Sequence, residues 1–210
     1  VDLHALRLDE SVRLELQEKG LLRLWVEVAL APAALLPQPA STERVTLPPQ
    51  PGALGSTIEL PLRSPLSLNP IELSPKGEGA RALAYALRSN VPTSACMRLT
   101  LFGSEQGAKS TPVVLCEASV ALPQLLRRNA DLRRAPLQMY ASNGRALAAV
   151  VFTLTAIETL QKLFKAAARL TGVAPAAATL SESDGAPSAG AHDGAPSAAP
   201  ADEQSTVAQR

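Results

Sequence analysis

Residues 21–30 read LLRLWVEVAL, and this stretch decides the fold class. The side chains at 22, 24, 26, 28 and 30 are all apolar, and they alternate with positions that include Arg23, Trp25 and Glu27. Successive side chains of a β-strand point to opposite faces of a sheet, so a period of two predicts a strand with one buried face. We therefore expect an all-β domain that contains this strand.

Further strand patterns follow along the chain. They lie at 45–47, 57–62, 82–87, 97–101, 114–120, 137–139 and 146–155. Pro61 indicates that the second of these is an edge strand or carries a bulge. The last is apolar on both faces, which favours a central position or one covered by a helix. Seven or eight strands with little helix predict an all-β, antiparallel sandwich of about eight strands.

Two helices are predicted beside these strands, a short one near 123–129 and a closing helix at about 156–170. In the closing helix Ile157, Leu160 and Phe164 recur at helical spacing and make one apolar stripe. The helix directly follows the last strand, so we expect the stripe to fold back onto the sheet and join the core.

The two ends of the chain differ from this body. In residues 1–20, Val12, Leu14 and Leu16 alternate as in a strand, and a short amphipathic helix fits almost as well. We interpret 1–20 as an N-terminal extension and 21–172 as the sandwich with its closing helix. Residues 173–210 are rich in Ala, Pro, Ser and Gly and contain the phrase DGAPSA twice, which predicts a disordered tail.

Groups that carry enzyme chemistry are sparse in the predicted domain. The two histidines, His4 and His192, lie in the extension and in the tail, so a histidine-based triad is not expected. The chain has no cysteine and histidine spacing of a zinc site and no phosphate-binding loop motif. We expect a non-catalytic protein with no cofactor and no metal ion.

The two cysteines predict no disulfide. Cys96 shares the polar side of its strand with Arg98, whereas Cys116 shares the apolar side of the next strand with Val114 and Val120. Side chains on opposite faces of a sheet point apart, so a bridge would require distortion. Two free thiols are typical of a reducing compartment such as the cytoplasm.

Trp25 and Arg23 are the first candidate partner-binding residues, because they share the polar side of their strand. Tryptophan and arginine are enriched at the energetic centres of protein interfaces. The alternative is that the closing helix or the N-terminal extension covers Trp25, since burial of a large aromatic ring is favourable.

Arg127, Arg128, Arg133 and Arg134 form the one basic cluster of the sequence, offset only by Asp131. Such a cluster is often a solvated connector. The alternative is a patch for an acidic protein face or for anionic lipid head groups. A net charge of +1 and the lack of interleaved aromatics argue against nucleic acid.

One segment resembles a known family. Residues 151–165, VFTLTAIETLQKLFK, follow Asn143-Gly144-Arg145 and resemble the end of the C-terminal domain of the retinitis pigmentosa GTPase regulator-interacting protein family. Upstream, IELPL at 58–62 and LNP at 68–70 are similar to a strand of that domain and the step after it. Residues 82–87 resemble the strand that follows, and the resemblance covers about 57–164.

The resemblance implies a C2-like sandwich that acts as a scaffold or adaptor. In that family the domain binds the propeller of the GTPase regulator at the ciliary transition zone, which implies a cytoplasmic location at the cilium. Many C2 domains bind calcium through several loop aspartates, but Asp131 is the only aspartate between 21 and 172, so we expect calcium independence. The alternative function is a calcium-independent C2 domain that binds anionic lipid through the basic cluster.

Overall fold

A computed structural model gives the fold of residues 1–36, 38–49, 56–62, 77–89, 91, 93–107 and 110–170, and the side chains of 167–170 are not described. The predicted tail at 173–210 lies outside these residues, as does the LNP segment at 68–70.

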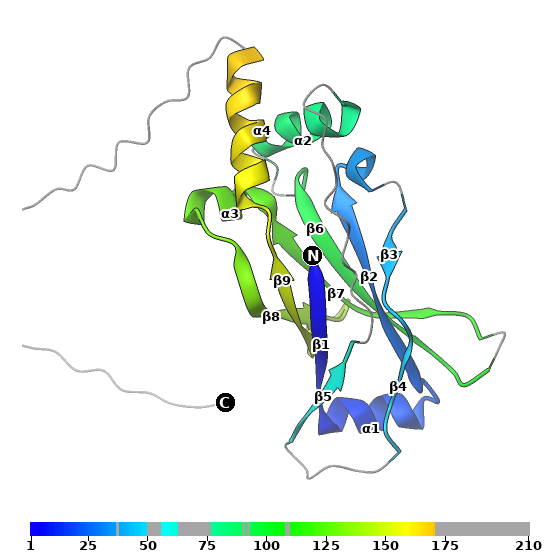
Figure 1. Cartoon of the computed structure of the whole chain (residues 1–210). Helices are drawn as coiled ribbons and strands as arrows, with labels where there is room; N and C mark the ends of the chain where they lie inside the picture. The colour runs from blue at the N-terminus through cyan, green and yellow to red at the C-terminus, as the bar shows by residue number, and fades with distance from the viewer. Residues whose placement is uncertain are drawn as a thin grey trace, which may run out of the picture. The chain divides into compact units, whose positions relative to one another are not determined.

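The described residues form one antiparallel sheet of nine strands (Figure 1). The strands are β1 Asp2–Asp9, β2 Arg23–Ala31, β3 Ala40–Ser41, β4 Val45–Thr46, β5 Thr57–Pro61, β6 Cys96–Ser104, β7 Val113–Ala121, β8 Leu132–Tyr140 and β9 Ala146–Leu154. Their order is β3-β2-β6-β7-β8-β9-β1-β5, and β4 also pairs with β2. The predicted all-β, antiparallel class is confirmed. Pro61 lies in the edge strand β5, and β9 is central, both as predicted.

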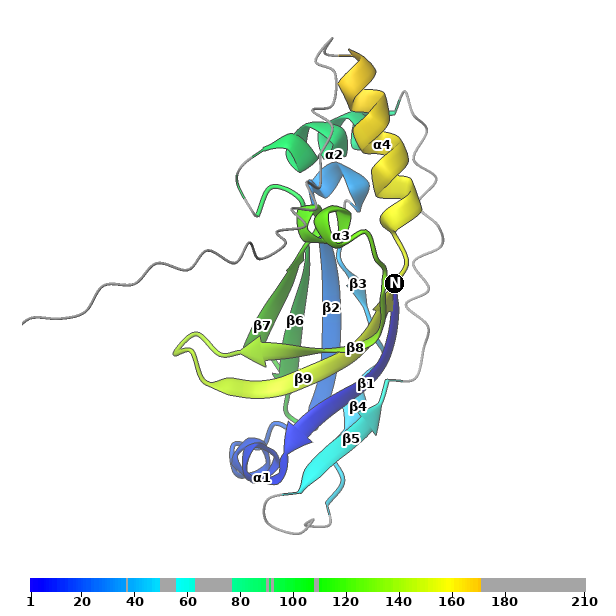
Figure 2. The ribbon, with the colours of Figure 1, turned by 90° about the vertical axis from the view of Figure 1, so that its left-hand side faces the viewer.

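The sheet folds over on itself between β7 and β8. Among the described residues these two strands pair only through Glu117 and Tyr140. Beyond this point the sheet forms two facing layers, β3-β2-β6-β7 and β8-β9-β1-β5, whose strands cross (Figure 2). Side chains of both layers, such as Leu99 and Phe152, are almost completely buried and form one core. The domain is therefore a sandwich whose two layers are joined along one edge.

Helices gather at the two ends of these layers. They are α1 Glu10–Glu18, the 3-10 helix η1 Ala33–Leu35, α2 Glu78–Arg88, α3 Leu122–Arg128 and α4 Ile157–Leu170. Figures 1 and 2 show α1 at one end and α2, α3 and α4 together at the opposite end. Leu160 of α4 belongs to the core, as predicted. However, α4 packs against α2 and α3 rather than back across the sheet.

Residues 1–20 are part of the sandwich and not an extension of it. They form β1 followed by α1, and β1 lies between β9 and β5. The strand was not predicted, because its register shifts between Leu3 and Ala5 and this shift breaks the alternation of apolar residues. Leu6 and Leu8 are nevertheless fully buried, so the sandwich begins at the first strand.

The predicted strand at 82–87 is wrong, because these residues lie in α2. Leucines that alternate with alanines satisfy a period of two, but alanine is also the strongest helix former. In the helix Ala80, Leu83 and Leu87 fall on one buried face, and Tyr85 is 81% exposed. The segment therefore also departs from the family strand with which it was compared.

Both cysteines are free, as the sequence predicted. Cys96 is buried, although its strand position placed it on the polar face. Burial, and to a lesser extent the charge of Glu117, raise the pKa of the Cys116 thiol to about 12. Cys116 therefore stays protonated at neutral pH.

Glu15 joins α1 to the turn between β8 and β9. Its carboxylate accepts hydrogen bonds from Arg145 and, at 2.6 Å, from Lys19. These bonds, that of Arg145 first, lower the pKa of Glu15 from 4.5 to about 2. A lowered folded-state pKa stabilises the protein above the unfolded value and stops doing so as the pH falls through the folded value.

The free energy of unfolding is expected to decrease as the pH falls from about 4.5 to about 2, and we expect this decrease to be smaller in Glu15→Gln. The effect is small, because the Glu15 side chain is 35% exposed and solvent screens its ion pairs. Urea unfolding of both proteins across this pH range measures it. If the free energy of unfolding fell equally with pH in Glu15→Gln and in the unsubstituted chain, the assigned ion pairs would be contradicted.

Candidate functional site

Trp25 does not present an exposed face to a partner. It is 5% exposed and stacks on Phe102, with ring centroids 5.5 Å apart and an interplanar angle of 10°. The Arg44 guanidinium lies 4.7 Å from the indole centroid, and the indole N–H donates to Glu27 at 3.4 Å. Phe102 and Arg44 therefore contribute to the cover of its ring. Arg23 lies half-buried in the same strand.

The four clustered arginines are all exposed, but they lie on two elements. Arg127 and Arg128 occupy the last turn of α3, where a positive charge favours the helix end. Arg133 and Arg134 lie in β8, at a point where its register with β9 shifts. The Arg134 backbone has φ of 44° and its N–H donates to the Thr153 hydroxyl at 3.1 Å. Of the four, Arg127 alone lines the groove described next.

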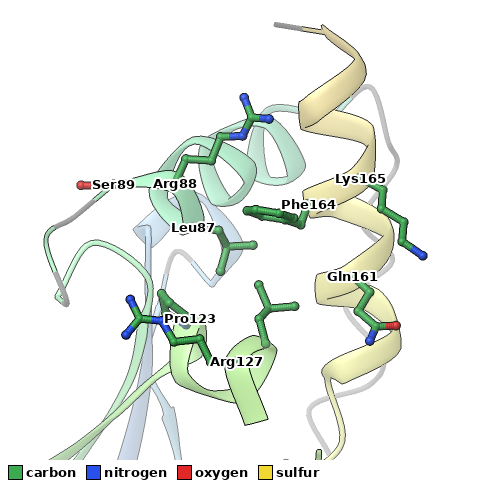
Figure 3. Close-up of a pocket in the computed structure, with 9 residues that line it drawn as sticks. Leu87, Arg88, Ser89, Pro123, Arg127, Gln161, Phe164 and Lys165 are labelled. Atoms are coloured by element: carbon green, nitrogen blue, oxygen red, sulfur yellow. The ribbon is translucent and has the colours of Figure 1, made fainter. Parts of the chain in front are cut away.

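A groove of about 560 Å³ lies where α2, α3 and α4 meet (Figure 3). All three helices contribute to it. Its lining residues are Leu87, Arg88, Ser89, Pro123, Leu126, Arg127, Gln161, Phe164 and Lys165. None of these residues is acidic, so the groove combines apolar surface with a positive rim.

The three helices contribute in the same way, each with an apolar residue followed at once by a basic one. These pairs are Leu87-Arg88 in α2, Leu126-Arg127 in α3 and Phe164-Lys165 in α4. Figure 3 shows Leu87 and Phe164 near the centre, with Arg88, Arg127 and Lys165 pointing outward in different directions. The Arg88 guanidinium also lies 5.9 Å from the centroid of the Phe164 ring.

Local sequence holds α3 beside α4. Strand β7 runs directly into α3, and the Leu122 N–H donates to the Ala95 carbonyl at 3.0 Å. Pro123 occupies the first turn, where its missing N–H costs nothing. The helix ends at Asn129 in the left-handed region, and the Asn129 side-chain oxygen accepts from the Gln161 amide of α4 at 2.5 Å.

Asp131 caps the start of α4. One carboxylate oxygen accepts the backbone N–H groups of Ala156 at 2.8 Å and Ile157 at 2.9 Å. These are donors at the start of α4, where the helix itself supplies no acceptor. The single aspartate of 21–172 therefore fixes the entry angle of the helix that forms one wall of the groove.

We expect Asp131→Ala to lower the free energy of unfolding by about 1 kcal/mol, the usual cost of losing a helix cap. Asp131→Asn keeps an oxygen that accepts the same bonds and is the matched control. Urea unfolding of the three proteins measures the difference. Equal midpoints for Asp131→Ala and the unsubstituted chain would contradict this role.

A second hollow, of about 490 Å³, lies at the single pairing of β7 with β8. Its lining contains both Arg98 and Glu117, with exposed Tyr140 at its side. Opposite charges in the same lining give no preference for a charged partner. We therefore take the groove between α2, α3 and α4 as the candidate site.

The described residues hold no cluster of metal-ligating side chains. Among them no three His, Cys, Asp or Glu side chains gather to hold a metal ion. The His4 ring nitrogen forms a 2.8 Å hydrogen bond with the Thr153 hydroxyl, and neither residue is among the described residues that line the groove. Within the described residues no helix is both long and apolar enough to span a membrane.

Most groove residues were missed from the sequence. Arg127 was a candidate, but Leu87 was placed in a strand and Phe164 was assigned to the core. Phe164 is only partly buried, and it packs against the core while lining the groove. The sequence did contain one signal for the groove: an apolar residue followed directly by a basic one occurs in each of α2, α3 and α4.

Comparison with known proteins identifies no family. No family model matches the chain, and no curated protein matches it. One similar solved structure is described as "CC2D1B coordinates ESRCT-III activity during the mitotic reformation of the nuclear envelope". The likeness covers 79% of this chain and 58% of that chain, at 7% sequence identity and a TM-score of 0.38. This chain thus spans less than two thirds of that structure, and a likeness of this degree assigns neither family nor function.

Proposed function

We propose that this chain is a non-catalytic binding module that docks a protein partner in the groove between α2, α3 and α4. The observation that carries the proposal is the composition of the groove. Apolar side chains line its centre, Arg127 and Lys165 stand exposed on its rim, and its described lining residues include no carboxylate. Apolar contact supplies affinity, and complementary charge supplies specificity and a fast encounter.

The shape of the groove favours a protein over a membrane. Arg88, Arg127 and Lys165 point in different directions around a concave centre, as Figure 3 shows. A bilayer surface attracts basic side chains that lie within about one Debye length of the same plane, roughly 8 Å at physiological salt. Anionic lipid remains the second candidate, because Arg128, Arg133 and Arg134 are exposed outside the groove.

The family resemblance supplies one specific partner to test, the propeller of the retinitis pigmentosa GTPase regulator. A scaffold role at the ciliary transition zone, in the cytoplasm, follows only if that propeller binds. A C2-like identity of the sandwich rests on the same resemblance.

The test is a titration of the full 210-residue chain against this propeller, with phosphatidylcholine vesicles with and without phosphatidylserine as a parallel arm. We expect propeller binding that persists at about 0.15 M salt, since apolar contact is not screened. Vesicle binding alone, lost in salt, would move the function to the membrane surface. No binding in either arm would exclude both of these partners.

A charge-reversal pair locates the binding surface. Arg127→Glu/Lys165→Glu changes two exposed groove cations, and Arg133→Glu/Arg134→Glu makes the same change in charge elsewhere on the surface. We expect only the first pair to abolish partner binding. An equal loss in both variants would show attraction by net charge and would contradict a role for the groove.

A further inference from the structure

We infer that the groove between α2, α3 and α4 receives an amphipathic α-helix whose apolar stripe is flanked on both sides by carboxylates. This inference rests on the proposed protein-binding function and adds the conformation and charge of the docked segment. Three properties of the groove carry it: the helical origin of its walls, its apolar centre and the distribution of its cations.

The walls favour a helical over an extended segment. Every described lining residue lies in α2, α3 or α4 or at the cap of α2, where backbone groups are largely engaged within the helices. An extended peptide docked here would bury its own N–H and C=O groups without the strand edge that normally pairs them. A helix satisfies those groups internally, so it presents only side chains to the groove.

The centre of the groove fits an apolar stripe. Leu87, Leu126 and Phe164 come from three different helices and surround one hollow. Apolar side chains spaced at i, i+3, i+4 and i+7 form such a stripe on a docked helix. Tyr85, 81% exposed and three residues before Arg88 on α2, continues the surface along the same helix face.

The cations predict carboxylates on both flanks of that stripe. In Figure 3 Arg88 and Arg127 lie on the side of α2 and α3, and Lys165 extends from α4 on the other side. A helix with acidic residues on one flank only would complement either Arg127 or Lys165 but not both. Acidic residues on both flanks complement the rim along its length.

A second copy of this chain does not supply such a helix from its described residues. The acidic helix among them is α1, with the sequence ESVRLELQE. Its apolar residues Val12 and Leu16 are buried in the core of their own domain. The described residues of a second copy therefore do not supply the docked segment, and the inference commits to a segment of a different protein.

The probe is a fluorescein-labelled peptide of repeated Leu-Glu-Glu-Leu-Leu-Glu-Glu heptads, titrated with the full chain by fluorescence anisotropy. Two peptides are its controls: a scrambled one of the same composition, and one with every Glu replaced by Lys. We expect saturable binding of the acidic peptide and at least about tenfold weaker binding of both controls, because the first control loses the stripe and the second loses charge complementarity.

Charge reversal in the protein completes the test. Arg127→Glu/Lys165→Glu is expected to weaken binding of the acidic peptide at least about tenfold and to strengthen binding of the lysine peptide. Arg133→Glu/Arg134→Glu is expected to change neither by more than about twofold. Thermal unfolding checks that both variants fold. A gain of lysine-peptide binding in Arg127→Glu/Lys165→Glu but not in Arg133→Glu/Arg134→Glu, which has the same net charge, is specific to the groove.

Three outcomes overturn the inference: no binding of the acidic peptide, equal binding of the scrambled peptide, or equal losses in both charge variants. If the acidic peptide fails while the propeller still binds through Arg127 and Lys165, the proposed function stands and the helical occupant is wrong. If the groove variants bind every protein probe as the unsubstituted chain does, both are wrong.

Discussion

Phe152→Ala is expected to lower the free energy of unfolding by about 3 to 5 kcal/mol, the usual cost of truncating a buried Phe. Phe152 is 1% exposed and lies in the central strand β9. Its register partners are Leu3 of β1 on one side and Ala135 of β8 on the other. The substitution opens a cavity between the two layers that these strands cannot collapse to fill.

Urea unfolding at equilibrium measures this loss. Leu147→Ala is the matched control, because Leu147 lies in the same strand but is only partly buried. We expect Leu147→Ala to lower the free energy of unfolding by clearly less than Phe152→Ala does, because a partly buried side chain removes less apolar area from water. A Phe152→Ala cost below about 1 kcal/mol would contradict the central position of β9 in the core.

Glu10→Ala is expected to cost a similar amount, about 3 to 5 kcal/mol, because it leaves a buried guanidinium without its carboxylate. The side chains of Glu10 and Arg13 are each 1% exposed. Arg13 donates Nε–H to both carboxylate oxygens, at 2.9 and 3.0 Å, and Nη2–H to Oε1 at 2.7 Å. Its Nη1 donates to Gln17 at 2.7 Å and to the Pro48 carbonyl at 3.1 Å, which joins α1 to the segment after β4.

The matched control is the double variant Glu10→Met/Arg13→Met. Replacing both members of a buried pair by apolar residues of similar volume is often neutral or stabilising. We therefore expect the double variant to be more stable than Glu10→Ala in the same urea measurement. A double variant that is less stable than Glu10→Ala would show that the ion pair stabilises the protein by more than the free energy that its two charges lose on removal from water.

The strands were predictable wherever the alternation of side chains was unbroken. Residues 22–30 were assigned closely because period two reports burial on one face of a sheet directly. Residues 146–155 were assigned closely because a short, continuous apolar run is typical of a strand buried on both faces. β1 was missed because its register shifts between Leu3 and Ala5, and β8 was predicted too short because its register shifts between Leu132 and Ala135. α2 was mistaken for a strand because Leu-Ala alternation fits both periods until tertiary packing selects one.

The candidate site was less predictable than the fold for a physical reason. Leu87, Leu126 and Phe164 are far apart in the sequence, and only the packing of three helices at one end of the sandwich brings them together. Charge singled out Arg127, but charge alone did not separate it from Arg133, which lies outside the groove lining. The burial of Trp25 was one of the two readings that the sequence allowed, but strand parity does not reveal that Phe102 stacks on its ring and that Arg44 lies over it.

The most direct test of the central claim is hydrogen–deuterium exchange of the full chain with and without a bound partner, using the acidic heptad peptide as the probe. The account predicts that added protection lies in α2, α3 and α4, the elements that line the groove. β7, β8 and the surface around Trp25 are expected to exchange at unchanged rates. Protection confined to β7 and β8 or to the Trp25 face, with α2, α3 and α4 unaffected, would contradict the assignment of the groove as the binding site.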